Sequence, residues 1–359
     1  MNDSVNDGVS DGANTEGPGP MAAFARSAPC WVDVQLPDLE AGKRFYGELF
    51  GWTFRAGEGP YTDAYSGEKL VAALAAKKDG RMPTAWGVYF ATDDIVATVA
   101  RIRAAGGLVI TDPVPTDGAG VVAQAADPGG AVFGLWQAGD RAGFEKQNEP
   151  VSFCWTEVHT RHKERVDAFY EEVFGFQGTD LDASGAALGI SGTDHAAAVQ
   201  DLVAHEAAEG AAGGAAGGAE QGAPGGAPEQ DAHEAPDTAG GDASGTAGQE
   251  GSGEAGRGVV RPHPDFRVWS PAGTEPGPDT AVCGRGVITD AFPAEMPSYF
   301  LAYFAVEDCN TTAGHAVRLG GRITAPPFDI PHGRMAVLQD DQGAVFAVLQ
   351  PPVSGKRAE

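Results

Sequence analysis

A stretch of 23 residues occurs twice in this chain. Residues 30–52 read CWVDVQLPDLEAGKRFYGELFGW, residues 154–176 read CWTEVHTRHKERVDAFYEEVFGF, and 9 of the 23 aligned positions are identical without a gap. The shared positions include Cys, Trp, Phe, Tyr and Gly, and chance does not reproduce the spacing of so many aromatic residues. The chain therefore contains an internal duplication, and its fold must contain the same unit at least twice.

The first copy predicts a strand, a helix and three further strands. Apolar and polar residues alternate over 31–36, which is typical of a strand with one face against helices. Asp38 can cap the helix that follows, and this helix is expected to end at Gly51. Strand candidates then begin at 52–54 and within 61–76, so the unit is read as β-α-β-β-β.

Three more units of the same order follow. The second opens with a strand at 86–90, the third with the second copy of the repeat, and the fourth with residues 298–304. Its final hairpin, residues 340–350, matches residues 127–137 at 6 of 11 positions. The sequence predicts an α+β fold of four βαβββ units paired into two domains.

Composition sets the expected boundaries. Gly-, Ala- and acid-rich segments with few apolar residues cannot offset their ordering entropy, so they are expected to be disordered. The predicted parts are a disordered N-terminus at 1–27, a first domain at 28–139, a linker at 140–150, a second domain at 151–351 with a disordered insertion at 203–258 in its third unit, and a tail at 352–359.

The formal net charge of −26 is concentrated in these segments. Residues 201–256 hold 11 acidic side chains and residues 1–20 hold four, with no Lys or Arg in either. The remainder is mildly acidic without a basic stripe, which argues against nucleic acid and anionic membranes as partners. There is no signal-peptide pattern, no membrane-length apolar run and no CxxC pair among the four cysteines, so a reduced, cytoplasmic protein is expected.

The repeated motifs resemble those of the vicinal oxygen chelate superfamily, which includes glyoxalase I, bleomycin-resistance proteins and extradiol dioxygenases. The motifs are the strand–Asp–helix opening, F-Y-x-x-x-F-G-[WF] in units one and three, and the G-G…D-x-x-G-A-V-F hairpin in units two and four. The resemblance covers about 30–139 and 151–351. It implies two glyoxalase-like domains, similar to bacterial double-domain proteins loosely called glyoxalase-like or hydroxylase.

The resemblance also implies where a metal would bind. The family places a His on a unit's first strand, and these positions fall on Trp31, Trp86, Trp155 and Phe300; its last-strand Glu falls on Gly134 and Ala347. None of these side chains can ligate a divalent ion. The expectation is therefore that both domains lack the usual metal site and use no cofactor.

Strand alternation gives the residues expected to line each cavity instead. In the first domain they are Trp31, Asp33, Gln35, Trp86, Val88, Phe90 and Trp136; in the second they are Trp155, Glu157, His159, Phe300, Ala302, Phe304 and Leu349. Large rings with indole donors suit a flat aromatic ligand. The alternative is that the rings fill each trough as core.

The acidic pair Asp33 and Glu157 occupies the same place in the repeat. A carboxylate on an apolar wall has a raised pKa and can act as a general base or a cation anchor; it can equally pair with an arginine across the sheet. His159 lies two residues after Glu157 on the same strand face, so the two can reach one point, although a lone surface or edge histidine is the plainer interpretation.

Three functions stay open. The leading hypothesis is a metal-independent protein, monomer or homodimer, that binds a small aromatic or hydrophobic molecule. The second is an enzyme of the lyase, isomerase, hydroxylase or dioxygenase type that uses Asp33 or the Glu157–His159 pair. The third is an interaction role for the acidic insertion.

Overall fold

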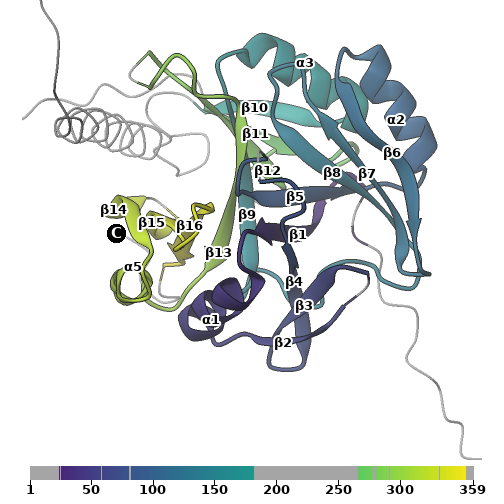
Figure 1. The fold of residues 1–359 in the computed structure, drawn as a ribbon. Helices are drawn as coiled ribbons and strands as arrows, with labels where there is room; N and C mark the ends of the chain where they lie inside the picture. Colours follow the sequence, from purple (N-terminus) through teal and green to yellow (C-terminus); the bar gives the residue numbers. More distant parts are fainter. Residues whose placement is uncertain are drawn as a thin grey trace, which may run out of the picture.

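The computed structural model describes residues 24, 26–57, 59–80, 82–181, 266–277, 280–290, 292–330 and 332–352. The segments expected to be disordered, 203–258 and nearly all of 1–27 and 352–359, lie outside these residues. Within them, each half of the chain forms one eight-stranded sheet (Figure 1). The predicted α+β fold of two glyoxalase-like domains is confirmed.

The first domain contains two βαβββ units in one sheet. Its strands are arranged in the order β2-β3-β4-β1-β5-β8-β7-β6, so the first strands of the two units lie side by side at the centre. The elements are β1 (Pro29–Leu36), α1 (Leu39–Phe50), β2 (Thr53–Ala56), β3 (Tyr61–Ser66), β4 (Lys69–Ala76), β5 (Trp86–Ala91), α2 (Ile95–Ala104), β6 (Leu108–Thr116), β7 (Gly120–Ala126) and β8 (Val132–Ala138).

The second domain repeats this topology, with the order β10-β11-β12-β9-β13-β16-β15-β14. The long segment between β10 and β11 interrupts the third unit where the insertion was predicted. The elements are β9 (Phe153–Thr160), α3 (Lys163–Phe174), β10 (Gln177–Leu181), β11 (Phe266–Ser270), β12 (Cys283–Val287), β13 (Tyr299–Ala305), α5 (Cys309–Arg318), β14 (Arg322–Ile330), β15 (Gly333–Gln339) and β16 (Val345–Gln350).

Local chemistry sets the helix ends. The Asp38 carboxylate accepts a hydrogen bond from the Ala41 backbone N–H at 2.9 Å and so caps α1. Asp94 and Asp308 cap α2 and α5 in the same way, whereas α3 follows His162, which makes no side-chain cap. Both α1 and α3 end at a left-handed glycine, as the repeated F-G motif predicts.

The two sheets pack back to back through one shared core. Strand β5 contacts β13 at the centre, α2 lies beside α3, and α1 lies beside α5 (Figure 1). The Phe90 ring lies 5.1 Å from that of Phe174 and 5.8 Å from that of Phe300, which belong to the other domain. The outer face of each sheet is therefore the one that points away from the partner domain.

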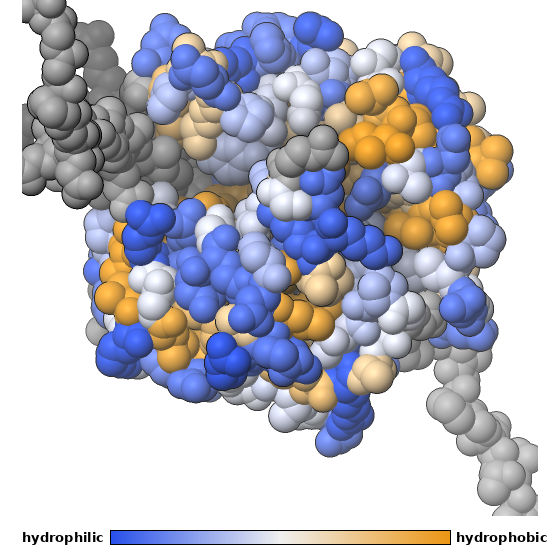
Figure 2. All heavy atoms as spheres, in the orientation of Figure 1, coloured by the Kyte–Doolittle hydropathy of each residue, from blue (hydrophilic) through white to orange (hydrophobic). Residues whose placement is uncertain are grey.

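Exposed apolar residues gather on one side of the first domain. Figure 2 shows apolar patches on the side that carries α2 and the edge strand β6 in Figure 1. The exposed large apolar residues on these elements are Val96, Leu108, Ile110 and Val114. No helix among the described residues has the length and apolar character needed to cross a bilayer.

All four cysteines are free thiols, and those at positions 30, 283 and 309 are buried, as expected of small apolar residues.

Candidate functional site

The outer face of the first sheet holds a concave cavity of about 240 Å³. Antiparallel pairing sets Trp31 opposite Tyr89, and parallel pairing sets Ala91 beside Trp136 and Tyr89 beside Gly134. Side chains of paired residues share a sheet face. The principal side chains lining the cavity are those of Trp31, Asp33, Tyr61, Asp63, Tyr89, Trp136 and Arg141.

The predicted lining was wrong for β5. Trp86 and Phe90 point to the opposite face, where the Trp86 ring lies 4.9 Å from that of Phe304 in the shared core. The pairing of β5 with β1 places the odd-numbered residues of both strands on the cavity face, so Tyr89 takes the place expected for Trp86 and Phe90. The strand pattern alone does not show this, because both faces of β5 are apolar.

The same correction applies to the second domain. Phe300 and Phe304 on β13 are buried in the shared core, and Phe300 contacts Phe90 across the domain interface. Tyr303, opposite Trp155, takes the outer position that corresponds to Tyr89. Val88 and Ala302, expected in the two linings, also belong to the shared core.

Asp33 lies at the centre of the cavity's polar chemistry. Its side chain is 5 % exposed, and its Oδ2 accepts a hydrogen bond from the Tyr89 hydroxyl at 2.9 Å. Burial raises the pKa of Asp33 to about 6, and hydrogen bonds from Tyr89 and Tyr61 partly oppose this rise. Asp33 is therefore a carboxyl group that changes its charge close to neutral pH.

Two tyrosine hydroxyls surround this carboxyl group. The negative charge of Asp33 raises the pKa of Tyr61, while burial is the main cause of the raised pKa of Tyr89, so both stay protonated donors. Gln35 also hydrogen-bonds Tyr61 and Gln124 hydrogen-bonds Tyr89. Gln35 thus supports the cavity from behind Tyr61, although it was expected in the lining itself.

An ion pair forms another wall of the cavity. Arg141 donates hydrogen bonds of 3.2 and 2.7 Å to the two carboxylate oxygens of Asp63, which is 3 % exposed. The Arg141 guanidinium also lies 5.6 Å from the Trp31 ring centroid, and Trp136 Nε1 donates to the Arg141 carbonyl at 3.0 Å. Arg141 therefore contacts both cavity tryptophans: its guanidinium contacts Trp31 and its backbone carbonyl accepts from Trp136.

Sequence reasoning did not identify four of these residues. The alternation of Tyr61 and Asp63 in β3 was a usable signal, since both point to the face of β1 that carries Asp33. Tyr89 could be assigned to the cavity only from the register of β5 against β1. Arg141 belongs to the segment interpreted as a linker, which instead packs on the first domain: the Phe144 backbone N–H donates to the Cys30 carbonyl at 2.9 Å.

The outer face of the second sheet carries a related arrangement that is richer in apolar side chains. Glu157 is 3 % exposed and accepts a hydrogen bond from Trp155 Nε1 at 3.1 Å, and it also interacts with the Tyr303 hydroxyl. The expected trough is occupied by an apolar cluster of Leu301, Tyr303, Ala325, Met335, Val337 and Ala347, against which Trp155 and Leu349 pack.

His159 and Glu157 do come together, as expected. The His159 Nε2 atom lies 3.3 Å from Glu157 Oε2, but without hydrogen-bond geometry, and the imidazole stacks on Tyr299 with ring centroids 5.0 Å apart. The pair lies on the outer face of the second sheet, whereas the cavity described above lies on the first.

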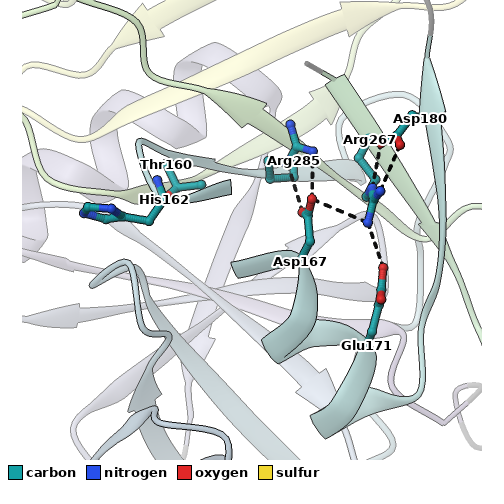
Figure 3. Close-up of polar contacts among 7 residues, drawn as sticks. All are labelled: Thr160, His162, Asp167, Glu171, Asp180, Arg267 and Arg285. Atoms are coloured by element: carbon teal, nitrogen blue, oxygen red, sulfur yellow. Dashed lines mark hydrogen bonds and ion pairs between the residues drawn. The ribbon is translucent and has the colours of Figure 1, made fainter. Parts of the chain in front are cut away.

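The densest charge cluster has a structural role (Figure 3). Arg285 on β12 is 2 % exposed and donates hydrogen bonds of 3.0 and 2.9 Å to Asp167 on α3. Arg267 on β11 joins Asp167, Glu171 and Asp180. These contacts fasten α3 to the inner face of the second sheet, and each charge faces an opposite one.

The cavity does not offer a set of metal ligands. Among the residues that the structure describes, no group of three or more His, Cys, Asp or Glu side chains is placed to hold a metal ion. Three carboxylates line the cavity: Asp33 accepts from two tyrosines, Asp63 pairs with Arg141, and Asp117 lies on the hairpin between β6 and β7.

The comparisons with known proteins agree with the glyoxalase-like fold described above. The family model of the "Glyoxalase/Bleomycin resistance protein/Dioxygenase superfamily" matches residues 30–135. A putative glyoxylase, CFP32, of Mycobacterium tuberculosis is 29 % identical over 91 % of this chain and 96 % of its own. The anthracycline biosynthesis protein DnrV of Streptomyces peucetius is 30 % identical over 92 % of this chain and 95 % of its own.

Among solved structures, the Mn(II)-bound glyoxalase from Novosphingobium aromaticivorans matches with a TM-score of 0.50 and 13 % sequence identity. The match covers 91 % of this chain and 83 % of that one. At this identity the likeness concerns the fold alone.

Proposed function

The chain belongs to the glyoxalase/bleomycin resistance protein/dioxygenase superfamily, and from that premise we propose that its first domain binds a small planar aromatic molecule. The observation that carries the proposal is the cavity of about 240 Å³ lined by Trp31 and Trp136, with Asp33 and Tyr61 as polar groups. Apolar ring faces with a few convergent polar groups are typical of small-molecule sites.

The rigidity of the cavity supports this proposal. Trp31 is held beneath Arg141, Trp136 donates to the Arg141 carbonyl, and Arg141 is fixed by Asp63. A ligand that enters between such groups need not order them, which lowers the entropic cost of binding. The name of the Streptomyces relative connects that protein with anthracycline biosynthesis, and anthracyclines are polycyclic aromatic compounds.

The test is calorimetric titration of the full chain with a panel of mono- and bicyclic aromatic compounds. Trp136→Ala should weaken binding at least about fivefold, since an aromatic contact with its buried area contributes about 1–3 kcal/mol. Trp136→Phe should restore much of it. Trp269→Phe, a change in the core of the second domain, serves as the control. The proposal fails if the Trp136→Ala protein binds the panel as tightly as the parent chain does.

A second candidate function is acid–base catalysis by Asp33, and the raised pKa of about 6 favours it. A general acid or base works best when its pKa lies near the operating pH. The oxygen of Tyr61, half-buried at the cavity, can accept a hydrogen bond from a substrate hydroxyl while the Tyr61 proton stays on the bond to Asp33. Incubation of a bound ketone in deuterated water, followed by NMR, would detect proton exchange that depends on Asp33. Exchange that persists in Asp33→Asn argues against this role.

A further inference from the structure

The carboxylates that line the cavity outnumber its cations. Asp33, Asp63 and Asp117 line it, against the single cation Arg141. Arg141 is engaged by both oxygens of Asp63, so these two charges compensate each other. None of the ion pairs between described residues involves Asp33 or Asp117. The cavity is therefore left with uncompensated negative charge at neutral pH.

Asp33 is a buried anion whose solvation comes from neutral donors. Its carboxylate receives hydrogen bonds from the Tyr89 and Tyr61 hydroxyls, and it lies on a wall whose other members include Trp31. Removing a carboxylate from water is unfavourable when no cation accompanies it. A cationic ligand would supply the missing charge, and an aromatic ring attached to it would meet the two indoles.

We propose that this cavity selects planar aromatic molecules that carry a protonated amine, with the ring against Trp31 and Trp136 and the ammonium group at the Asp33 carboxylate. The inference rests on the proposed function, since it specifies the ligand class of the same site. Asp117, on the hairpin between β6 and β7 at the cavity rim, adds a second attraction for the incoming cation. The Trp136 ring also attracts cations through its quadrupole, whereas the Trp31 ring already lies against the Arg141 guanidinium.

Binding of a cation should depend on the ionisation of Asp33. The groups that face it are Tyr61 from β3 and Tyr89 from β5, with the compensated Asp63–Arg141 pair across the cavity. The tyrosines stay neutral because their pKa values are raised. Below pH 6, where Asp33 takes up its proton, the affinity for an ammonium ligand should fall about tenfold per pH unit.

The experiment compares three probes that share one ring: naphthylmethylammonium, naphthylmethanol and naphthoate, all substituted at the same carbon. Each is titrated calorimetrically into the full chain at about pH 7.5, where Asp33 is mostly ionised. We expect the ammonium probe to bind at least about tenfold more tightly than the alcohol, which is a difference of about 1.4 kcal/mol. Asp33→Asn should remove this preference and keep the Tyr89 hydrogen bond.

Two controls separate charge from folding. Asp93→Asn removes an acid that is 77 % exposed at the start of α2, and it should leave the preference unchanged. If Asp33→Asn does not fold, a pH series on the unmodified chain from about pH 5 to 8 provides the same test, because only the ammonium probe should lose affinity at acid pH.

The outcomes distinguish this inference from the function on which it rests. Equal or tighter binding of naphthylmethanol overturns the cation preference and leaves the aromatic site in place. Tightest binding of naphthoate also overturns it and assigns Arg141 as the anchor. Failure of all three probes to bind removes the aromatic site and the inference together.

Discussion

The Tyr46 hydroxyl donates a hydrogen bond of 2.8 Å to Asp340, a residue 294 positions away in the chain. Tyr170, which occupies the place of Tyr46 in the second copy of the repeat, donates to Asp127 at 3.2 Å. Each bond joins a helix of one domain to the turn that connects the last two strands of the other domain. The two most recognisable repeated motifs therefore meet across the domain interface, in a reciprocal pair.

Tyr46→Phe should lower the free energy of unfolding by about 1–3 kcal/mol, because Asp340 is buried and would lose a donor. The pKa of Asp340 should rise further, since the Tyr46 bond now opposes the effect of burial. Chemical denaturation of the full chain measures the change. Tyr65→Phe, on the partly exposed strand β3, is the matched control and should alter stability by less than about 0.5 kcal/mol. Equal effects of the two substitutions would contradict a role for the Tyr46 bond.

Asp33 should make stability fall as the pH rises. Its pKa is raised from 3.8 to about 6 in the folded chain, so between these values the folded state binds a proton that the unfolded state has lost. The contribution is complete below about pH 4 and is lost as the pH passes 6, with a magnitude of at most about 3 kcal/mol. The raised pKa values of Asp127 and Asp340 act in the same direction.

Asp33→Asn isolates this contribution. Denaturation midpoints of the variant and the parent chain, measured from about pH 4 to 7.5, should converge at low pH, where both side chains are neutral, with the parent losing more stability as the pH rises. Parallel curves would show that Asp33 titrates alike in the folded and unfolded states.

Arg141→Gln should destabilise the first domain by about 1–3 kcal/mol, because it leaves the buried Asp63 carboxylate without its cation. This loss of stability is smaller than that expected for a fully buried ion pair, because the Arg141 side chain is 24 % exposed. Arg55→Gln breaks the Arg55–Glu68 pair, whose side chains are 49 % and 86 % exposed, and should change stability much less, because water and salt screen an exposed pair. Thermal unfolding at low ionic strength compares the two, and a larger effect at Arg55 would refute the assignment.

Gly134→Ala should disturb the cavity through Tyr89. A Cβ atom at position 134 would lie 2.0 Å from the Tyr89 ring, which must therefore move and weaken its bond to Asp33. We expect a loss of about 1–3 kcal/mol in stability and weaker binding of the aromatic panel. Gly80→Ala has open space around the new methyl group and should do neither. Unchanged binding in Gly134→Ala would show that the position of Tyr89 is not critical.

Local patterns were sufficient for the units of the fold. The spacing of Phe45, Tyr46 and Gly51, and its recurrence at Phe169, Tyr170 and Gly175, predicted the helices and their ends. These features depend on residues close together in the chain, such as a capping carboxylate or a left-handed glycine. The position of Asp33 on the cavity face was also readable, since it alternates with the apolar residues Val32 and Val34.

The strand register decided the rest of the site. Trp86 and Tyr89 both lie on a strand that is buried on its two faces, and a shift of one residue moves every side chain to the other face. The register of the hydrogen bonds between β1 and β5 places the Tyr89 side chain on the cavity face and the Trp86 side chain in the shared core.

The sequence by itself determined four βαβββ units, their pairing into two sheets and the placement of Trp31 and Asp33 on one strand face. Only the tertiary structure decided that Arg141 lines the cavity, that Tyr89 rather than Trp86 faces it, and that an apolar cluster with Leu301 and Met335 forms on the second sheet. The reason is physical: helix ends and strand alternation follow from neighbouring residues, whereas a cavity forms where packing between distant strands leaves space.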